Sequence, residues 1–220
     1  MEVNFVVSNV FSILSLVFYS VVYVPQMWLI YKTKSSVGIS ILMLLLWTQA
    51  DCVSLMGSII VGLEMNLIVI GWYHFLVGVV MIGMSMWYQS NKCTTILITM
   101  VFVVANILAC ALLMVLLPQQ DLFWGDILGW IATVVYVVGR FPQLILNHKR
   151  KSTEGLSAWM YVLTMAGNLS YLLSIVVYSQ EADYIRTNLP WMILTILLFL
   201  LDVLVLVQIG MYRVKQDSGV

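Results

Sequence analysis

Two stretches of the chain repeat each other: residues 25–51 read PQMWLIYKTKSSVGISILMLLLWTQAD, and residues 142–168 read PQLILNHKRKSTEGLSAWMYVLTMAGN. They align at a constant offset of 117 residues without a gap, and ten of the 27 positions are identical. Each stretch begins with a Pro-Gln pair inside a long apolar segment. Internal duplication around interrupted apolar helices is typical of transporters built from two pseudosymmetric repeats.

The composition of the whole chain predicts an integral membrane protein. Of its 220 residues, 62% are hydrophobic and only 9% are charged, and the mean hydropathy is +1.02. About 20 apolar residues are needed to cross ~30 Å of hydrocarbon. Seven segments meet this requirement: residues 5–31, 38–62, 66–88, 94–117, 124–147, 155–178 and 188–212. The hydropathy and the net charge of zero exclude nucleic-acid binding.

The predicted fold is an all-α membrane protein of seven transmembrane helices, with residues 1–220 forming one membrane domain. Residues 5–88 form a three-helix repeat with the first Pro-Gln motif, and residues 124–213 form a second repeat with the other. The segment 94–117 is a linker helix between them. Because one extra span inverts the chain, both repeats keep the same orientation, which makes them parallel repeats in a 3+1+3 arrangement.

The positive charges predict the topology. Eight Lys and Arg residues fall in alternate loops or the C-terminal tail, whereas the opposite side carries only Arg186. The eight are Lys32, Lys34, Lys92, Lys149, Arg150, Lys151, Arg213 and Lys215. Because Lys and Arg in short loops stay cytoplasmic, we expect a lumenal or extracellular N-terminus and a cytosolic C-terminus.

The two Pro-Gln motifs are candidate hinges. A proline inside a helix removes a backbone hydrogen bond and clashes with the carbonyl four residues earlier. One membrane proline is often a passive kink, but Pro25 and Pro142 lie at equivalent positions and precede Gln26 and Gln143. We therefore predict that these four residues form the hinges of an alternating-access cycle.

Asp51 is the leading candidate for substrate binding. A carboxylate near the middle of a span costs ~2.5–3.5 kcal/mol on insertion scales, so it requires an interior partner or a water-filled cavity. Its repeat equivalent is Asn168. If the two face each other across the pseudo-twofold axis, the site suits a cationic or zwitterionic solute. The alternative is a polar clamp between helices, with no ligand.

Further candidates are two more intramembrane charges and a pair of matched tyrosines. Arg140 and Asp202 fall at similar predicted depths and could pair as a gate or latch. An unpaired Asp202 would instead be a second cation site or a proton relay. Tyr19 and Tyr136 also match under the offset of 117 residues and are candidate substrate contacts.

No catalytic constellation is present in the sequence, so we expect a protein that is not an enzyme. The three cysteines, Cys52, Cys93 and Cys110, lack the spacing of a metal or redox motif, and we expect no disulfide framework. We also expect no cofactor and no metal site.

These residues resemble the PQ-loop family of seven-helix membrane proteins, which includes cystinosin and the lysosomal or vacuolar cationic amino acid transporters. SWEET sugar transporters and KDEL receptors are similar in architecture. The cationic amino acid branch is the most similar. Five stretches carry that resemblance: Gly139-Arg140-Phe141-Pro142-Gln143, Lys151-Ser152-Thr153-Glu154-Gly155-Leu156-Ser157, Ala166-Gly167-Asn168-Leu169-Ser170-Tyr171, Asn188-Leu189-Pro190-Trp191 and Leu200-Leu201-Asp202.

The resemblance implies a lysosomal or vacuolar exporter of arginine, lysine and histidine to the cytosol. The chain departs from the branch at Ala50, where glycine is usual, and at Ser54, where asparagine is common, but it keeps Asp51. The partners implied are basic amino acids and membrane lipid.

Two alternatives stay open from the sequence. The first is a substrate-sensing receptor, or transceptor, that recruits cytosolic proteins through the loop at 149–151 and the tail. The second is a carrier of a neutral amino acid such as cystine. A homodimer is compatible with the sequence, although no motif decides the oligomeric state.

Overall fold

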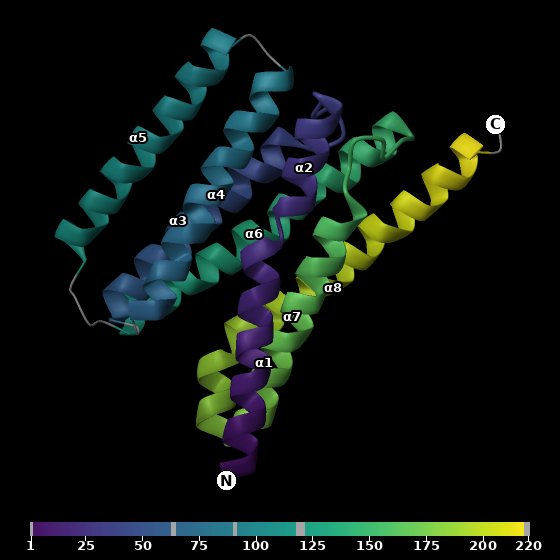
Figure 1. Ribbon diagram of the computed structural model, residues 1–220. Helices are drawn as coiled ribbons and strands as arrows, with labels where there is room; N and C mark the ends of the chain where they lie inside the picture. Colours follow the sequence, from purple (N-terminus) through teal and green to yellow (C-terminus); the bar gives the residue numbers. More distant parts are fainter. Residues whose placement is uncertain (1, 63–64, 90–91, 118–121, 218–220) are drawn as a thin grey trace. The chain divides into compact units, whose positions relative to one another are not determined.

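A computed structural model describes residues 2–62, 65–89, 92–117 and 122–217. Every regular element in these residues is an α-helix (Figure 1). The helices are α1 (Glu2–Val21), α2 (Val24–Thr33), α3 (Ile41–Val61), α4 (Met65–Gln89), α5 (Lys92–Leu116), α6 (Leu122–Arg150), α7 (Ala158–Tyr178) and α8 (Ala182–Asp217).

Seven stretches of the described chain are helical, long and apolar enough to cross a membrane, which confirms the predicted seven-span, all-α fold. Helices α1 and α2 together form the first of them. The spans are Asn4–Thr33, Ile41–Ile60, Ile68–Gln89, Ile96–Leu116, Phe123–Arg150, Ala158–Tyr178 and Trp191–Tyr212.

The chain divides into two compact units that do not coincide with the sequence repeats. The terminal unit comprises Met1–Lys32 and Gln143–Val220, and the central unit comprises Thr33–Pro142. Each unit therefore joins the first helix of one repeat to the second and third helices of the other. Helix α6 contributes to both units, because the boundary falls between Pro142 and Gln143. The repeat limits inferred from the sequence stay a prediction.

In the terminal unit, α1 lies along α7, and α7 packs against α8 (Figure 1). Three residues on one face of α1 hydrogen-bond to α7. The Ser8 hydroxyl donates to the Ser174 carbonyl at 2.8 Å, and the Ser15 hydroxyl donates to the Gly167 carbonyl at 3.1 Å. The third is Tyr19, described below. Small residues and interhelical hydrogen bonds are what hold helices together in lipid, where apolar burial provides little drive.

In the central unit, α3 packs against α4, and α5 makes fewer contacts with both. Helices α3 and α4 approach closely because Gly78 on α4 has no side chain. A β-carbon there would lie only 2.4 Å from the hydroxyl oxygen of Thr48. Met56, Ile60 and Leu128 form a buried cluster where α3 meets the first half of α6.

The two Pro-Gln motifs occupy different local structures. Helix α1 ends at Val21 and α2 begins at Val24, so Pro25 lies in the first turn of a new helix, where its missing N–H leaves no bond unmade. The Met27 amide donates to the Tyr23 carbonyl at 2.9 Å across the start of α2. Pro142 instead lies inside the continuous helix α6. The prediction of a mid-helix proline therefore describes Pro142 and not Pro25.

The loops after the two motifs repeat one another in backbone conformation. Lys34 directly follows α2 and has a φ of 54°, and Lys151 directly follows α6 and has a φ of 50°. Both are left-handed, as the first residue beyond a helix often is. The internal duplication thus extends to the turn that ends each motif.

Candidate functional site

Asp51 on α3 forms a hydrogen-bonded pair with Tyr136 on α6 in the central unit. The phenol of Tyr136 donates to the Oδ1 atom of Asp51 at 2.5 Å. Asp51 is only 7% exposed, and its Oδ2 atom is buried without a hydrogen-bond partner among the described residues. His74 on α4 interacts electrostatically with the same carboxyl group. The carboxyl group is thus anchored on one oxygen and has acceptor capacity on the other.

Trp47 and Arg140 extend this pair into a four-residue cluster. Residues four apart on a helix share a face, so Trp47 lies beside Asp51 on α3, and Arg140 lies beside Tyr136 on α6. The indole N–H of Trp47 donates to the Tyr136 carbonyl at 3.1 Å, and the two rings meet edge to face at 6.4 Å. The guanidinium of Arg140 stacks over Trp47, 3.8 Å from the ring centroid, which is a cation–π contact.

Gly139 allows this cluster to close. A β-carbon at Gly139 would lie 2.7 Å from the Cδ1 atom of Trp47, a distance that real β-carbons do not adopt. The glycine thus lets α6 approach α3 at the level of the indole. Arg140 itself is fully buried, with its Nη1 atom 3.7 Å from the sulfur of Met43.

The terminal unit contains the equivalent pair, Tyr19 on α1 and Asn168 on α7. The phenol of Tyr19 donates to the Oδ1 atom of Asn168 at 2.6 Å. A glycine again permits the contact, since a β-carbon at Gly167 would lie 2.8 Å from Cε1 of Tyr19. The Nδ2 atom of Asn168 is buried without a hydrogen-bond partner among the described residues. Both units therefore present one anchored polar group with unused hydrogen-bonding capacity.

A small pocket of about 110 Å³ adjoins Asn168 between α7 and α8. Its other polar lining residue is Thr195, and the rest of the lining is apolar. Ligand pockets are usually ≈ 300–1,000 Å³, so this one is too small for an amino acid as it stands. Asp202 is fully buried on α8 in the same unit.

Gln26, the glutamine of the first Pro-Gln motif, holds the start of α7. Its Oε1 atom accepts from the Ser157 amide at 2.7 Å, and its Nε2 atom donates to the Gly155 carbonyl at 3.0 Å. Ser157 is the N-cap residue of α7 but makes no capping bond with its own side chain. The buried Gln26 amide thus satisfies backbone groups in the loop before α7, which would otherwise be left without partners.

Gln143, the glutamine of the second motif, starts a chain of amide hydrogen bonds within the terminal unit. Its Nε2 atom donates to Asn147 at 2.8 Å, and Asn147 donates to the Oε1 atom of Gln208 on α8, also at 2.8 Å. Gln208 in turn donates to the Leu144 carbonyl at 3.1 Å. The second half of α6 is thereby tied to α8.

The structure brings together some of the candidate residues and separates others by unit. It pairs Tyr136 with Asp51 and Tyr19 with Asn168. Arg140 and Asp202 belong to different units, so their pairing stays a prediction. The same holds for an Asp51–Asn168 site across the pseudo-twofold axis.

The role of Trp47 was not predicted from the sequence. Two signals in the sequence point to it: its spacing of four residues from Asp51, and Gly139, whose absent side chain makes room for an aromatic ring.

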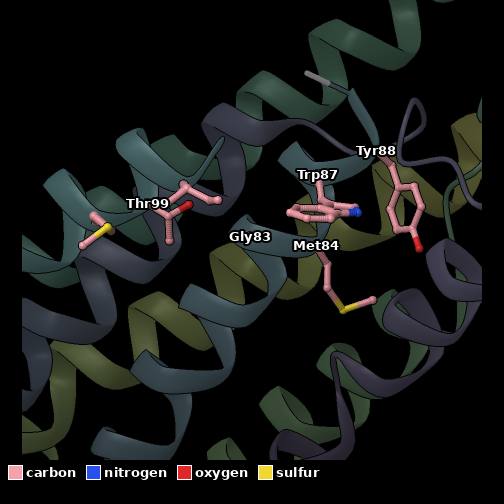
Figure 2. A pocket seen from close by; sticks show the side chains of 7 residues that line it. Gly83, Met84, Trp87, Tyr88 and Thr99 are labelled. Atoms are coloured by element: carbon pink, nitrogen blue, oxygen red, sulfur yellow. The ribbon is translucent and has the colours of Figure 1, made fainter. Parts of the chain in front are cut away.

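A separate hollow lies on the α4–α5 face of the central unit. It is a groove of about 540 Å³ lined by Gly83, Met84, Trp87, Tyr88, Ile96, Thr99 and Met100. Figure 2 shows the Met84, Trp87 and Tyr88 side chains together with Thr99. None of the predicted site residues lines this groove.

The duplicated stretches match a known family. The sequence model of the PQ loop repeat matches residues 7–67 and again residues 124–184, which together make up more than half of the chain. The chain belongs to the PQ-loop repeat family. This assignment confirms the family that the two Pro-Gln motifs indicated.

Relatives of this PQ-loop protein are vacuolar and lysosomal amino acid transporters. It is 20% identical to the vacuolar lysine transporter YPQ1 of Saccharomyces cerevisiae, over 94% of this chain and 93% of that protein. It is 35% identical to the human lysosomal amino acid transporter 1 homolog, over 40% of this chain and 32% of that one. A shorter match, 51% identical over 51 residues, is to the yeast vacuolar arginine/histidine antiporter YPQ2, covering 23% of this chain and 16% of that protein.

Among solved structures, the PQ-loop protein is similar to a eukaryotic SWEET transporter. The TM-score is 0.64 with 13% sequence identity, covering 98% of this chain and 99% of that one. At this identity the likeness concerns the fold alone, and it agrees with the predicted seven-helix architecture. The relatives and the structural neighbour are transporters, in agreement with the prediction that the chain is not an enzyme.

Proposed function

We propose that this protein exports cationic amino acids, namely arginine, lysine and histidine, from the lysosome or vacuole to the cytosol. The observation that carries the proposal is Asp51. It is a buried carboxylate in a membrane-spanning helix, with one oxygen held by Tyr136 and the other without a hydrogen-bond partner among the described residues. A buried carboxylate is stabilised by an ammonium or guanidinium group, whereas a neutral solute leaves it uncompensated.

The surroundings of Asp51 support a binding role over a purely structural clamp. A clamp would use both carboxylate oxygens on protein donors, because an unmet buried acceptor costs about 1–3 kcal/mol. Here one oxygen is left for a ligand. In this proposal Tyr136 fixes the carboxylate in position, and the Arg140–Trp47 stack forms the neighbouring wall. Asn168, Tyr19 and Asp202 are the proposed polar contacts contributed by the terminal unit.

Movement in this proposal centres on the two Pro-Gln motifs. One boundary between the two compact units falls between Pro142 and Gln143, and the first span is interrupted between α1 and α2, just before Pro25. Both observations support hinges at these positions, because Pro kinks and helix breaks are where a membrane helix bends most readily. The proposed orientation keeps the N-terminus in the lumen. A lumen-positive potential would then favour export of a cation by ~2.3 kcal/mol per charge per 100 mV.

The test is counterflow of labelled arginine and lysine in proteoliposomes, with the wild type and Asp51→Asn measured side by side. Counterflow requires only exchange, so no proton gradient is presupposed. We expect arginine exchange in the wild type and its loss in the variant. Labelled cystine serves as the neutral comparison. Exchange of cystine in place of arginine would indicate a neutral amino acid carrier. No exchange of any amino acid by folded protein would favour a receptor.

A further inference from the structure

Two of the three cysteines face each other across two helices of the central unit. The Sγ atom of Cys52 on α3 lies 3.2 Å from the Sγ atom of Cys110 on α5, and both thiols are free. A disulfide bond is about 2.05 Å long, so the sulfurs need to close by roughly 1 Å to form one. Neither residue takes part in the proposed transport site, although Cys52 directly follows Asp51.

We propose that Cys52 and Cys110 form a reversible disulfide when the membrane is exposed to hydroperoxides. One thiol, as its thiolate, attacks the peroxide oxygen, the O–O bond breaks, and a sulfenic acid forms as an alcohol or water leaves. The second thiol then displaces the sulfenic oxygen as water, and the S–S bond forms. Overall, two thiols and one hydroperoxide, ROOH, give one disulfide, one ROH and one water. The thiols are oxidised and the peroxide is reduced.

The positions of the two sulfurs suit this order of events. Helix α5 exposes apolar side chains along much of its length, Leu97, Val101 and Leu108 among them, as a lipid-facing helix does. Cys110 on this helix is partly exposed, whereas Cys52 is buried. A hydroperoxide dissolved in the bilayer therefore reaches Cys110 first. Cys52 is already within contact distance to resolve the sulfenic acid, so over-oxidation is disfavoured.

The bridge would join helices that already touch and would hold them together. Cys110 and Leu113 of α5 pack against the buried cluster of Met56 and Ile60 on α3, so the bond forms without separating that contact. Because Cys52 is adjacent to Asp51, the bridge would restrain α3 at the level of the carboxylate. If the proposed transport function holds, we expect the oxidised protein to carry less arginine than the reduced one.

The bridge itself is tested by mass, independently of transport. The full chain in liposomes is treated with cumene hydroperoxide, which partitions into the membrane, and its intact mass is measured. A Cys93→Ser background leaves only the two facing cysteines. We expect this protein to lose two hydrogens, to regain them with a phosphine reductant, and to do neither when Cys52→Ser or Cys110→Ser is added. An unchanged mass, or a gain of oxygen atoms in place of the loss of hydrogens, would overturn the proposal.

The regulatory consequence is tested by flux in the same vesicles. We expect arginine counterflow by the Cys93→Ser protein to fall in proportion to the bridged fraction and to recover on reduction. The protein that also carries Cys110→Ser should keep its flux under the same oxidant. Full flux from fully bridged protein would refute the regulatory role. If every sample lacks flux, the mass measurement still decides whether the bridge forms, and the proposed transport function alone fails.

Discussion

The two tyrosine pairs make the same kind of hydrogen bond to chemically different acceptors. Tyr19 donates to Asn168 at 2.6 Å, and Tyr136 donates to Asp51 at 2.5 Å, in each case beside a residue that lets the helices approach. One acceptor is a neutral amide and the other is a carboxyl group. Both pairs thus keep the same helix contact, whereas the charge of the acceptor differs. In the central unit, Trp47 packs against the tyrosine of the carboxyl pair. The helix contact is common to both pairs, so we expect it to govern stability. The charge of the acceptor differs between them, so we expect it to govern the choice of substrate.

Replacing the carboxyl acceptor Asp51 by an amide gives the largest expected effect, which is on arginine flux. Removing one partner of a buried charge pair costs about 3–5 kcal/mol, so Asp51→Asn should reduce arginine flux by ~10²–10⁴-fold. The melting temperature should change little, because asparagine still accepts from Tyr136. The measurement is counterflow together with thermal stability in detergent.

Adding Asn168→Asp to Asp51→Asn sharpens this result. The double variant restores the charge but carries it on α7 and not on α3, the helix that bears Trp47. We expect flux to stay low. Recovery of flux would mean that only the net charge matters and that the surroundings of Asp51 are irrelevant.

The next prediction concerns the glycine that lets the helices approach beside each tyrosine pair. Gly139→Ala forces a β-carbon to within 2.7 Å of Trp47, and such overpacking typically costs about 1–3 kcal/mol. We expect the melting temperature to fall by about 2–4 °C per kcal/mol. The matched control is Gly83→Ala on α4, where a β-carbon meets nothing within 4 Å.

The terminal unit also contains a glycine at a close helix contact and a matched control glycine. Gly167→Ala would place a β-carbon 2.8 Å from Tyr19, whereas Gly210→Ala on α8 meets nothing within 4 Å. Similar losses for Gly139→Ala and Gly167→Ala would show that the shared contact stabilises both units. Equal effects of the test and control substitutions would instead indicate general intolerance of alanine.

Removing the phenol hydroxyl of each tyrosine should distinguish the two pairs by a smaller difference, measured as stability. A hydrogen bond to a charged group is worth about 1.5–3 kcal/mol and one between neutral groups about 0.5–1.5 kcal/mol. Tyr136→Phe should therefore destabilise the protein by roughly 1 kcal/mol more than Tyr19→Phe, measured by thermal unfolding of both variants. A larger loss for Tyr19→Phe would contradict an ionised Asp51 in the resting protein.

The most local expected effect is at the first Pro-Gln motif. Gln26→Glu keeps the acceptor for the Ser157 amide but removes the donor to the Gly155 carbonyl. We expect a loss of about 1–3 kcal/mol from the unmet buried groups, seen first as faster hydrogen exchange at the start of α7. Protection that stays at the wild-type level would show that Gln26 does not hold this helix end.

The spans were predictable from sequence because apolar length is dictated by the thickness of the bilayer. The repeat offset also matched Tyr19 with Tyr136, but as candidate substrate contacts. Their hydrogen bonds to Asn168 and Asp51, respectively, were not predicted. Hydropathy, however, does not indicate which transmembrane helices pack against one another. Their contacts depend on small residues and scattered hydrogen bonds, so the packing of α1 on α7 was not predictable.

Two local features could not be predicted from the sequence, for related reasons. The break before Pro25 depends on where the chain restarts its helical hydrogen bonds, at Tyr23, and not on the proline alone. The contact between Cys52 and Cys110 joins residues 58 apart on different helices, and no short-range pattern records it.

The packing of α1 also has a consequence for how the protein is made. The central unit is one continuous stretch, residues 33–142, and its parts emerge from the ribosome one after another. Helix α1 is synthesised before the other described helices, but the acceptor of Ser8, the Ser174 carbonyl, lies on α7, in the fifth span made after it. Until α7 has been made, the hydroxyls of Ser8, Ser15 and Tyr19 lack their α7 acceptors. Biogenesis factors that shelter polar groups in membranes should therefore engage this chain at its first span and release it only when α7 arrives.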